Sequence, residues 1–147
     1  RVFRVESADL LAPIEALDGK GLGETLLTPT RIYVKPVLAL LEQVEVHGVS
    51  HITGGGFYEN IPRSIPRGLG AKIEKAALRI PPVFQLIAGT GGVPERDMFN
   101  TFNMGVGMSV TVPKEQADQA LAVLAENGVD AYIMGEIVPG EEKVTLC

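Results

Sequence analysis

The stretch SHITGGGFYENIPR, residues 50–63, places a histidine close to three consecutive glycines. Histidine side chains exchange protons or bind phosphate near neutral pH, so His51 is a candidate for chemistry. Glycines lose extra chain entropy on folding, and Gly54, Gly55 and Gly56 therefore indicate that something approaches the main chain closely. A strand, a glycine turn and a helix start direct unpaired N–H groups toward one point, which predicts an anion site. A tight bend beside a structural histidine fits the same residues, and both interpretations stay open.

A second dense stretch is NTFNMGVGM, residues 100–108. From Gly105 to Val112 larger apolar side chains alternate with glycine, serine and threonine, which predicts a strand with one face of small residues. Either a helix packs closely on that face or a ligand lies against it. Asn103 precedes the strand, and its amide can donate to and accept from a polar substrate. Asparagine is also common in turns, so that alternative stays open.

Several basic side chains are candidates for binding phosphate. Arg63 and Arg67 can each bind it through two parallel hydrogen bonds, although flanking prolines also fit a solvated loop. Arg31 and Lys35 form another pair, next to Thr30, which we interpret as a helix cap.

The sequence lacks the residue patterns of two kinds of site, a metal site and the active site of a serine hydrolase. His47 and His51 lie four residues apart on either side of a helix end and a glycine, with no cysteine nearby, so no metal site is predicted. We interpret His47 as a complement to the negative end of the helix dipole. The chain has no GxSxG motif, which argues against a serine hydrolase.

Short helices and strands must position these side chains. Apolar residues at positions 34, 37, 38, 41 and 44 predict one buried face of a helix, which Gly48 ends. Further predicted segments are a strand at 49–53, a strand within 71–78, a helix at 81–91, a strand at 105–112 and a helix from 113 to 127.

The C-terminal part predicts two more strands. Residues 129–138, VDAYIMGEIV, fit a buried strand, and Pro139-Gly140 fits a turn. KVTL, residues 143–146, would then pair with the preceding strand as a hairpin at the sheet edge. Strands and helices mix without a β-α-β rhythm, so we expect an α+β fold with a mixed β-sheet layered with helices.

Composition narrows the class of partner. The 147 residues fit one domain, and 13 basic against 18 acidic residues give a net charge of −5, which predicts neither nucleic-acid nor membrane binding. The single cysteine, Cys147, permits no internal disulfide and fits the cytoplasm. Because the chain starts at Arg1 without a methionine, we interpret it as a fragment of a longer protein.

Three stretches in this order, PTRIYVKPVLALLE, HITGGGFYENIPR and MFNTFNMGVGM, resemble the C-terminal domain of the phosphoribosylformylglycinamidine cyclo-ligases, or aminoimidazole ribonucleotide synthetases. The resemblance runs from about residue 20 to the final strand. It implies that residues 1–147 are a single C-terminal domain of this superfamily and that the N-terminal ATP-binding domain is absent.

The resemblance also implies an activity, which is ATP-dependent ring closure of formylglycinamidine ribonucleotide to 5-aminoimidazole ribonucleotide in purine biosynthesis. The full-length enzyme would be a homodimer, with ATP and Mg²⁺ bound mainly by the N-terminal domain, and this fragment would bind no cofactor and show no turnover. By matching positions, His51 would be catalytic. The substrate or its phosphate would contact Gly54, Gly55, Gly56, Asn60, Arg63, Asn103 and Gly105.

Two alternatives remain. The C-terminal domains of formylglycinamidine ribonucleotide synthetase, selenophosphate synthetase and thiamine-monophosphate kinase are similar in fold. A stand-alone module that binds a phosphate ligand would instead need no partner domain.

Overall fold

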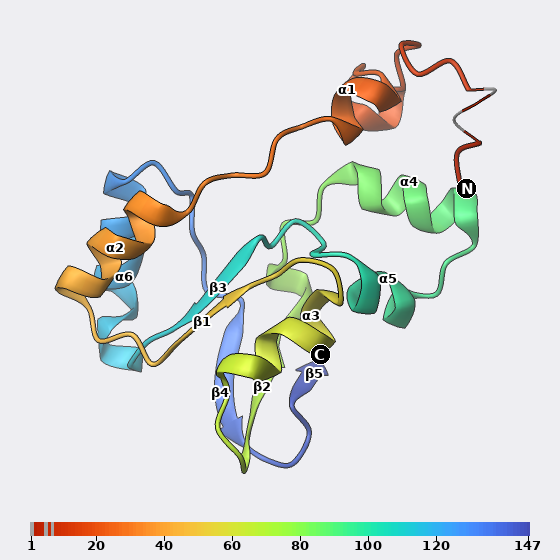
Figure 1. Cartoon of the computed structure of the whole chain (residues 1–147). Coiled ribbons are helices and arrows are strands. Elements are labelled where there is room, and N and C mark those ends of the chain that lie inside the picture. The colour runs from red at the N-terminus through yellow and green to blue at the C-terminus, as the bar shows by residue number, and fades with distance from the viewer. Residues whose placement is uncertain (1, 5, 7) are drawn as a thin grey trace.

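The computed structural model describes residues 2–4, 6 and 8–147 and shows two small β-sheets and six α-helices among them (Figure 1). The helices are α1 (Leu22–Leu26), α2 (Val34–Gln43), α3 (Gly56–Asn60), α4 (Pro82–Gly91), α5 (Glu95–Thr101) and α6 (Ala117–Glu126). The strands are β1 (Gly48–His51), β2 (Leu69–Ile73), β3 (Met108–Thr111), β4 (Gly135–Pro139) and β5 (Val144–Leu146). Short 3-10 turns lie at Glu15–Leu17, Ile61–Ser64, Lys75–Ala77 and Lys114–Gln116. The fold class is α+β, as expected.

The two sheets differ in how their strands pair. β1 and β3 form an antiparallel ribbon in which His51 lies opposite Met108. In the second sheet β2 is central, antiparallel to β4 on one side and parallel to β5 on the other. The sheet is therefore mixed, as predicted, but it is divided into two separate pieces.

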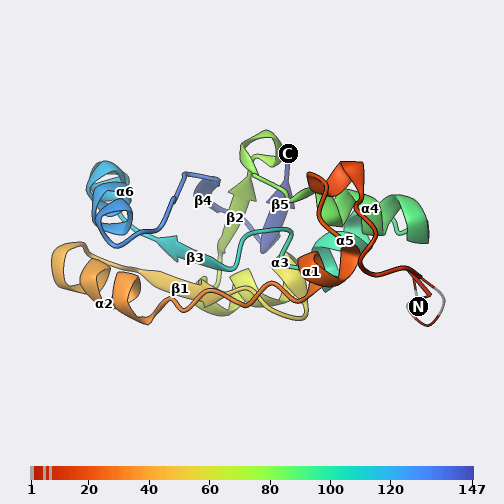
Figure 2. The same ribbon diagram turned by 90° about the horizontal axis from the view of Figure 1, so that it is seen from above.

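Two separate hydrophobic cores hold these elements. The larger core lies under β2, α3 and α5, and its fully buried side chains include Ile52, Phe57, Ile73 and Met98. The smaller core lies between α2 and α6, which sit side by side at one end of the molecule (Figures 1 and 2). The ribbon β1–β3 connects this helical pair to the rest of the fold.

The helix α2 forms where the period predicts it, but its buried face is different. The prediction placed residues 34, 37, 38, 41 and 44 inward. Pro36, Leu40 and Val44 are buried instead, and of the predicted set only Val44 is among them. Val34, Leu38 and Leu41 are 62%, 55% and 53% exposed, so the predicted inward face is wrong. The sequence VKPVLALLEQ is apolar on almost every side, and its period therefore does not select one face.

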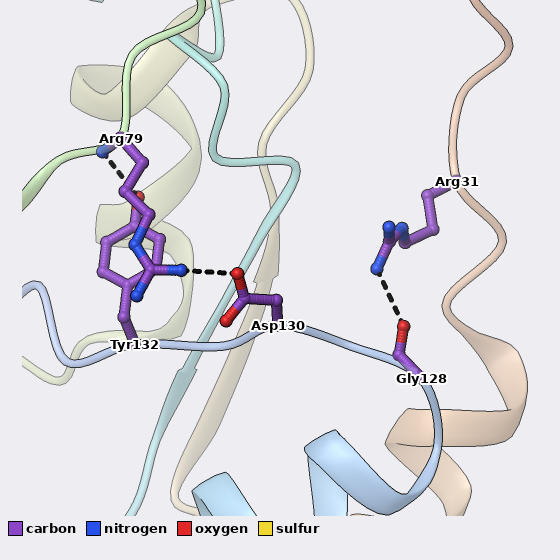
Figure 3. A network of polar contacts seen from close by, with 5 residues as sticks. All are labelled: Arg31, Arg79, Gly128, Asp130 and Tyr132. Carbon is purple, nitrogen blue, oxygen red and sulfur yellow. Dashed lines mark hydrogen bonds and ion pairs between the residues drawn. The ribbon is translucent and has the colours of Figure 1, made fainter.

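The predicted C-terminal hairpin is also wrong. β5 pairs with β2 rather than with β4, because the connection after Pro139 carries the chain to the opposite side of β2. Residues 129–134 are irregular and do not continue β4 as a buried strand. They are fixed by side chains: the Arg79 guanidinium lies 4.6 Å from the centre of the Tyr132 ring and donates to Asp130 over 2.7 Å (Figure 3).

Other predicted elements are confirmed with shifted ends. α4 and α6 occupy the predicted segments, and β2 lies partly inside the predicted range. The strand expected from residue 105 starts only at Met108, because Met104 and Gly105 have φ angles of 49° and 90° and form a turn. Thr30 does not cap α2, whose N-cap residue is Tyr33 and has no side-chain cap.

Candidate functional site

His51 lies exposed at the end of β1, where three sequence stretches meet. The ring of Tyr33, from the segment before α2, is 5.9 Å from the His51 ring with an interplanar angle of 68°, an edge-to-face contact. The paired strand β3 brings Met108 opposite His51. Residues about 20 and 60 positions away in the chain are thus neighbours of the imidazole.

Gly107 makes room for Tyr33. A Cβ on Gly107 would collide with the Tyr33 hydroxyl, so only glycine lets this ring lie against the segment before β3. The small-residue face predicted from the sequence is therefore covered at this point by a protein side chain. Tyr33 itself was missed, and the run of small residues beginning at Gly105 was the available signal.

A groove of about 400 Å³ opens beside His51. Its walls are mainly apolar, and its polar groups come from Arg31, Tyr33 and His51. The guanidinium of Arg31 donates to the carbonyl of Gly128, just after α6, over 3.3 Å (Figure 3). The full lining is Arg31, Ile32, Tyr33, Val34, Val37, Leu38, His51 and Met108.

The glycine turn joins two of the stretches. Gly55 and Gly56 have φ angles of 91° and 54°, in the left-handed region that favours glycine. Gly56 is buried, and a Cβ there would collide with the carbonyl of Phe99 at the end of α5. The Phe57 and Phe99 rings also meet edge to face at 5.2 Å. The turn and the stretch around α5 are therefore packed directly together.

Asn60 holds the turn from its inner side. It is 2% exposed, and its amide donates to the carbonyls of Gly56 at 2.8 Å, Gly54 at 3.2 Å and Thr53 at 3.4 Å. All three bonds are donated by the side-chain NH2 group of Asn60 to main-chain carbonyls. In this conformation that group therefore holds the glycine turn and is not directed toward a ligand.

Gly54 faces open space. Apart from Gly54 itself and its two chain neighbours, no described residue has an atom within 4 Å of the position of a Cβ on Gly54. The N–H groups of Gly54 and Gly55 find no acceptor in the described part of the chain. Beside Gly55 the surroundings are negative, because a carboxylate oxygen of Glu59 lies 2.5 Å from the position of a Cβ there. Glu59 was missed as a neighbour of the turn.

The other predicted residues lie around this centre. The side chains of Arg63 and Arg67 are exposed and make no hydrogen bond or ion pair with any described residue. Asn103 accepts the N–H of Gly105 at its side-chain oxygen over 3.0 Å, as a turn asparagine does. His47 lies beyond the end of α2, and its Nε2 is 3.2 Å from Glu45.

Over residues 2–4, 6 and 8–147, no group of three or more histidine, cysteine, aspartate or glutamate side chains is arranged to hold a metal ion. Within the same residues, no helix is both long and apolar enough to cross a membrane.

Residues 3–147 match the family described as AIR synthase related protein, C-terminal domain. The chain belongs to this family. Relatives named phosphoribosylformylglycinamidine cyclo-ligase include one from Shouchella clausii, 57% identical over 126 residues that cover 86% of the chain and 36% of the relative. One from Lachnoclostridium phytofermentans is 49% identical over 148 residues, covering 100% and 43%. The chain therefore spans about two fifths of the length of these relatives.

The fold of this AIR synthase related domain is similar to that of solved structures. A crystal structure of E. coli HypE, described as a hydrogenase maturation protein, aligns with a TM-score of 0.64 and 24% identity over 85% of this chain and 40% of that chain. At this identity the likeness shows the fold alone.

Proposed function

We propose that this chain is the C-terminal half of an ATP-dependent cyclo-ligase that converts formylglycinamidine ribonucleotide to 5-aminoimidazole ribonucleotide. The family membership and the names of relatives at about 50% identity support this assignment. One observation supports particular residues: three sequence stretches come together at His51. They contribute Tyr33, the glycine turn that follows His51, and β3, which pairs with β1.

Ring closure requires the attacking nitrogen of the substrate to lose a proton. ATP phosphorylates the formyl amide oxygen, a substrate nitrogen attacks the activated carbon, and the oxygen leaves as phosphate. The attacking nitrogen loses a proton as the ring closes, and an exposed imidazole at the end of β1 is a suitable acceptor. In our proposal His51 takes up this proton.

The substrate phosphate would bind beside the glycine turn. Gly54 is exposed, and its N–H group lacks an acceptor among the described residues. The exposed side chain of Arg63 likewise has no hydrogen-bond or ion-pair partner among them. The Glu59 carboxylate disfavours an anion directly over Gly55, so we place the main contact at Gly54. Asn103 and Gly105 would line the other side of the cleft, while Gly56 and Asn60 hold the turn in shape.

ATP and Mg²⁺ would be bound elsewhere in the longer protein. In this proposal the contribution of the described chain is substrate binding and proton transfer. We also propose that the longer protein supplies an N-terminal ATP-binding domain and acts as a cytoplasmic homodimer.

The test is turnover of the full-length protein with His51→Asn. We expect formation of 5-aminoimidazole ribonucleotide and ADP to slow by about 10²- to 10⁴-fold, as on loss of a general base. His47→Asn is the matched control, because the His47 side chain is also exposed but lies outside the groove, with its Nε2 next to Glu45. Unchanged kcat and KM in His51→Asn would remove His51 from the site, and a full-length protein that forms no 5-aminoimidazole ribonucleotide would refute the function.

A further inference from the structure

Tyr33 is held at both ends and contacts the His51 ring between them. It is the N-cap residue of α2, and its carbonyl accepts the Val37 N–H over 3.0 Å, so its main chain is fixed at the first turn of the helix. Leu40 anchors that helix in the core shared with α6. At the far end of the side chain, the hydroxyl lies against Gly107. The ring is therefore carried by a rigid element.

The requirement for glycine at position 107 comes from Tyr33. Gly107 is not among the glycines with a positive φ angle, so other residues can adopt its backbone conformation. Outside the adjacent residues, the three atoms nearest to a Cβ at this position all belong to Tyr33: the hydroxyl, Cζ at 3.0 Å and Cε2 at 3.4 Å. The Gly107 carbonyl also accepts the Ile52 N–H over 2.9 Å. The surface that supports the Tyr33 ring is thus fixed to the residue that follows His51.

The contact with His51 is made by the ring of Tyr33 and not by its hydroxyl. The ring centres are 5.9 Å apart with an interplanar angle of 68°. The hydroxyl makes no hydrogen bond with any described residue, and the His51 side chain makes neither a hydrogen bond nor an ion pair with any of them. An exposed side chain without a polar partner samples several rotamers. The ring contact is therefore the interaction available to orient the imidazole.

We propose that Tyr33 is a positioning residue: supported by Gly107, its ring holds the His51 imidazole in one orientation beside the groove. Aromatic pairs are strong enough to shift a rotamer equilibrium by about two- to tenfold. The consequence for turnover rests on the proposed function, because a general base must lie within hydrogen-bond reach of the proton that it accepts. The orientation of the ring does not rest on it and can be observed without substrate.

The first experiment observes the imidazole itself. Full-length protein labelled with ¹³C at histidine Cε1 gives a resonance for His51, which is assigned by its loss in His51→Asn. Aromatic rings shift the resonances of nearby protons, so we expect Tyr33→Leu to move the His51 signal and Tyr33→Phe to leave it near its parent position. The signal of His47, which lies next to Glu45 and outside the groove, should move in neither variant. An unchanged His51 signal in Tyr33→Leu would overturn the proposal.

The second experiment measures kcat and KM of the same full-length variants. Tyr33→Leu should lower kcat by about three- to tenfold and leave KM within about twofold, because the ring acts on His51 and not on the substrate. Tyr33→Phe should keep both parent values, since it retains the ring. If Tyr33→Phe is as slow as Tyr33→Leu, or if either variant raises KM alone, Tyr33 contacts the substrate and the positioning role is refuted.

Substitution of Gly107 tests the same contact with Tyr33 left in place. Gly107→Ala should lower kcat as Tyr33→Leu does, because the new Cβ collides with the hydroxyl. Adding Tyr33→Phe removes the closest colliding atom and should restore most of kcat. Gly89→Ala is the control, since outside its own helix and adjacent residues no described atom lies within 4 Å of a Cβ there. A double variant as slow as Gly107→Ala would contradict the proposal.

Two further outcomes separate positioning from folding and from the proposed function. Thermal unfolding of each variant identifies loss of fold, and if Tyr33→Leu does not fold, the Gly107→Ala pair decides. If the full-length parent protein forms no 5-aminoimidazole ribonucleotide, the proposed function fails. The His51 signal then decides alone whether Tyr33 holds the ring.

Discussion

The three glycines of residues 54–56 occupy different environments. Gly56 is buried against the end of α5 with a φ of 54°, Gly55 has a φ of 91° beside Glu59, and Gly54 has open space around it. The bare backbone that drew attention in the sequence therefore has two causes. Gly56 is required by packing inside the protein, whereas nothing in the described packing requires a glycine at Gly54, and the role proposed for it is in binding.

This difference predicts that two alanine variants change the free energy of unfolding by very different amounts. Gly56→Ala should lower the free energy of unfolding by at least about 2 kcal/mol, because the new Cβ meets the Phe99 carbonyl and the backbone is left-handed. Gly54→Ala should change it by less than about 0.5 kcal/mol. Urea unfolding followed by circular dichroism measures both. Equal losses would show that the turn is not packed as described.

Among single residues, the types and spacing in the sequence predicted candidates but not the residues that support them. His51 and Gly54, three positions apart, are both exposed, and their role stays a prediction. Tyr33 lies 18 positions before His51, and only the folded chain reveals that Gly107 accommodates its hydroxyl. Asn60 was expected at the ligand, but its amide is bonded to three carbonyls of the turn. Such contacts depend on tertiary packing, which local pattern does not contain.

At the scale of elements, local pattern located helices better than it located partners. α4 begins at prolines and ends before Gly92 in a left-handed conformation, and both signals are local. The side of α2 that faces α6 and the neighbour of β5 are decided by distant segments. Pro139-Gly140 suggested a hairpin, yet β5 runs parallel to β2. Short apolar strands have little local information about which strand they join.

The parallel pairing of β5 can be tested with Val144→Ala. Val144 is 3% exposed opposite Ala71, so the truncation should cost about 2 kcal/mol of unfolding free energy. The Ala71 N–H donates to Lys143, and the Cys147 N–H donates to Ile73, each over 2.9 Å. Hydrogen exchange at these two amides should therefore be slow in the parent chain and faster in the variant. Val49→Ala, at a 38% exposed position in β1, is the control, and fast exchange at Ala71 in the parent would contradict the pairing.

At the scale of the whole molecule, two cores predict two units of local unfolding. Leu40→Ala removes a fully buried side chain from the small core between α2 and α6. Amide exchange should accelerate in these two helices and stay unchanged in β2. Ile73→Ala, in the larger core, should accelerate exchange in β2 and not in α2. If either variant speeds exchange throughout the chain, the two cores unfold as one.

The ribbon β1–β3 links the small core between α2 and α6 to the part of the fold that holds His51. β1 follows α2 in the chain and ends at His51, and β3 follows the Met104–Gly105 turn and leads toward α6. Both strands thus span the distance between the helical pair and the imidazole, and the paired backbones resist sliding past each other. A displacement of α2 would therefore be transmitted through the paired strands to His51 and Met108 together, so the two sides of the groove keep their register.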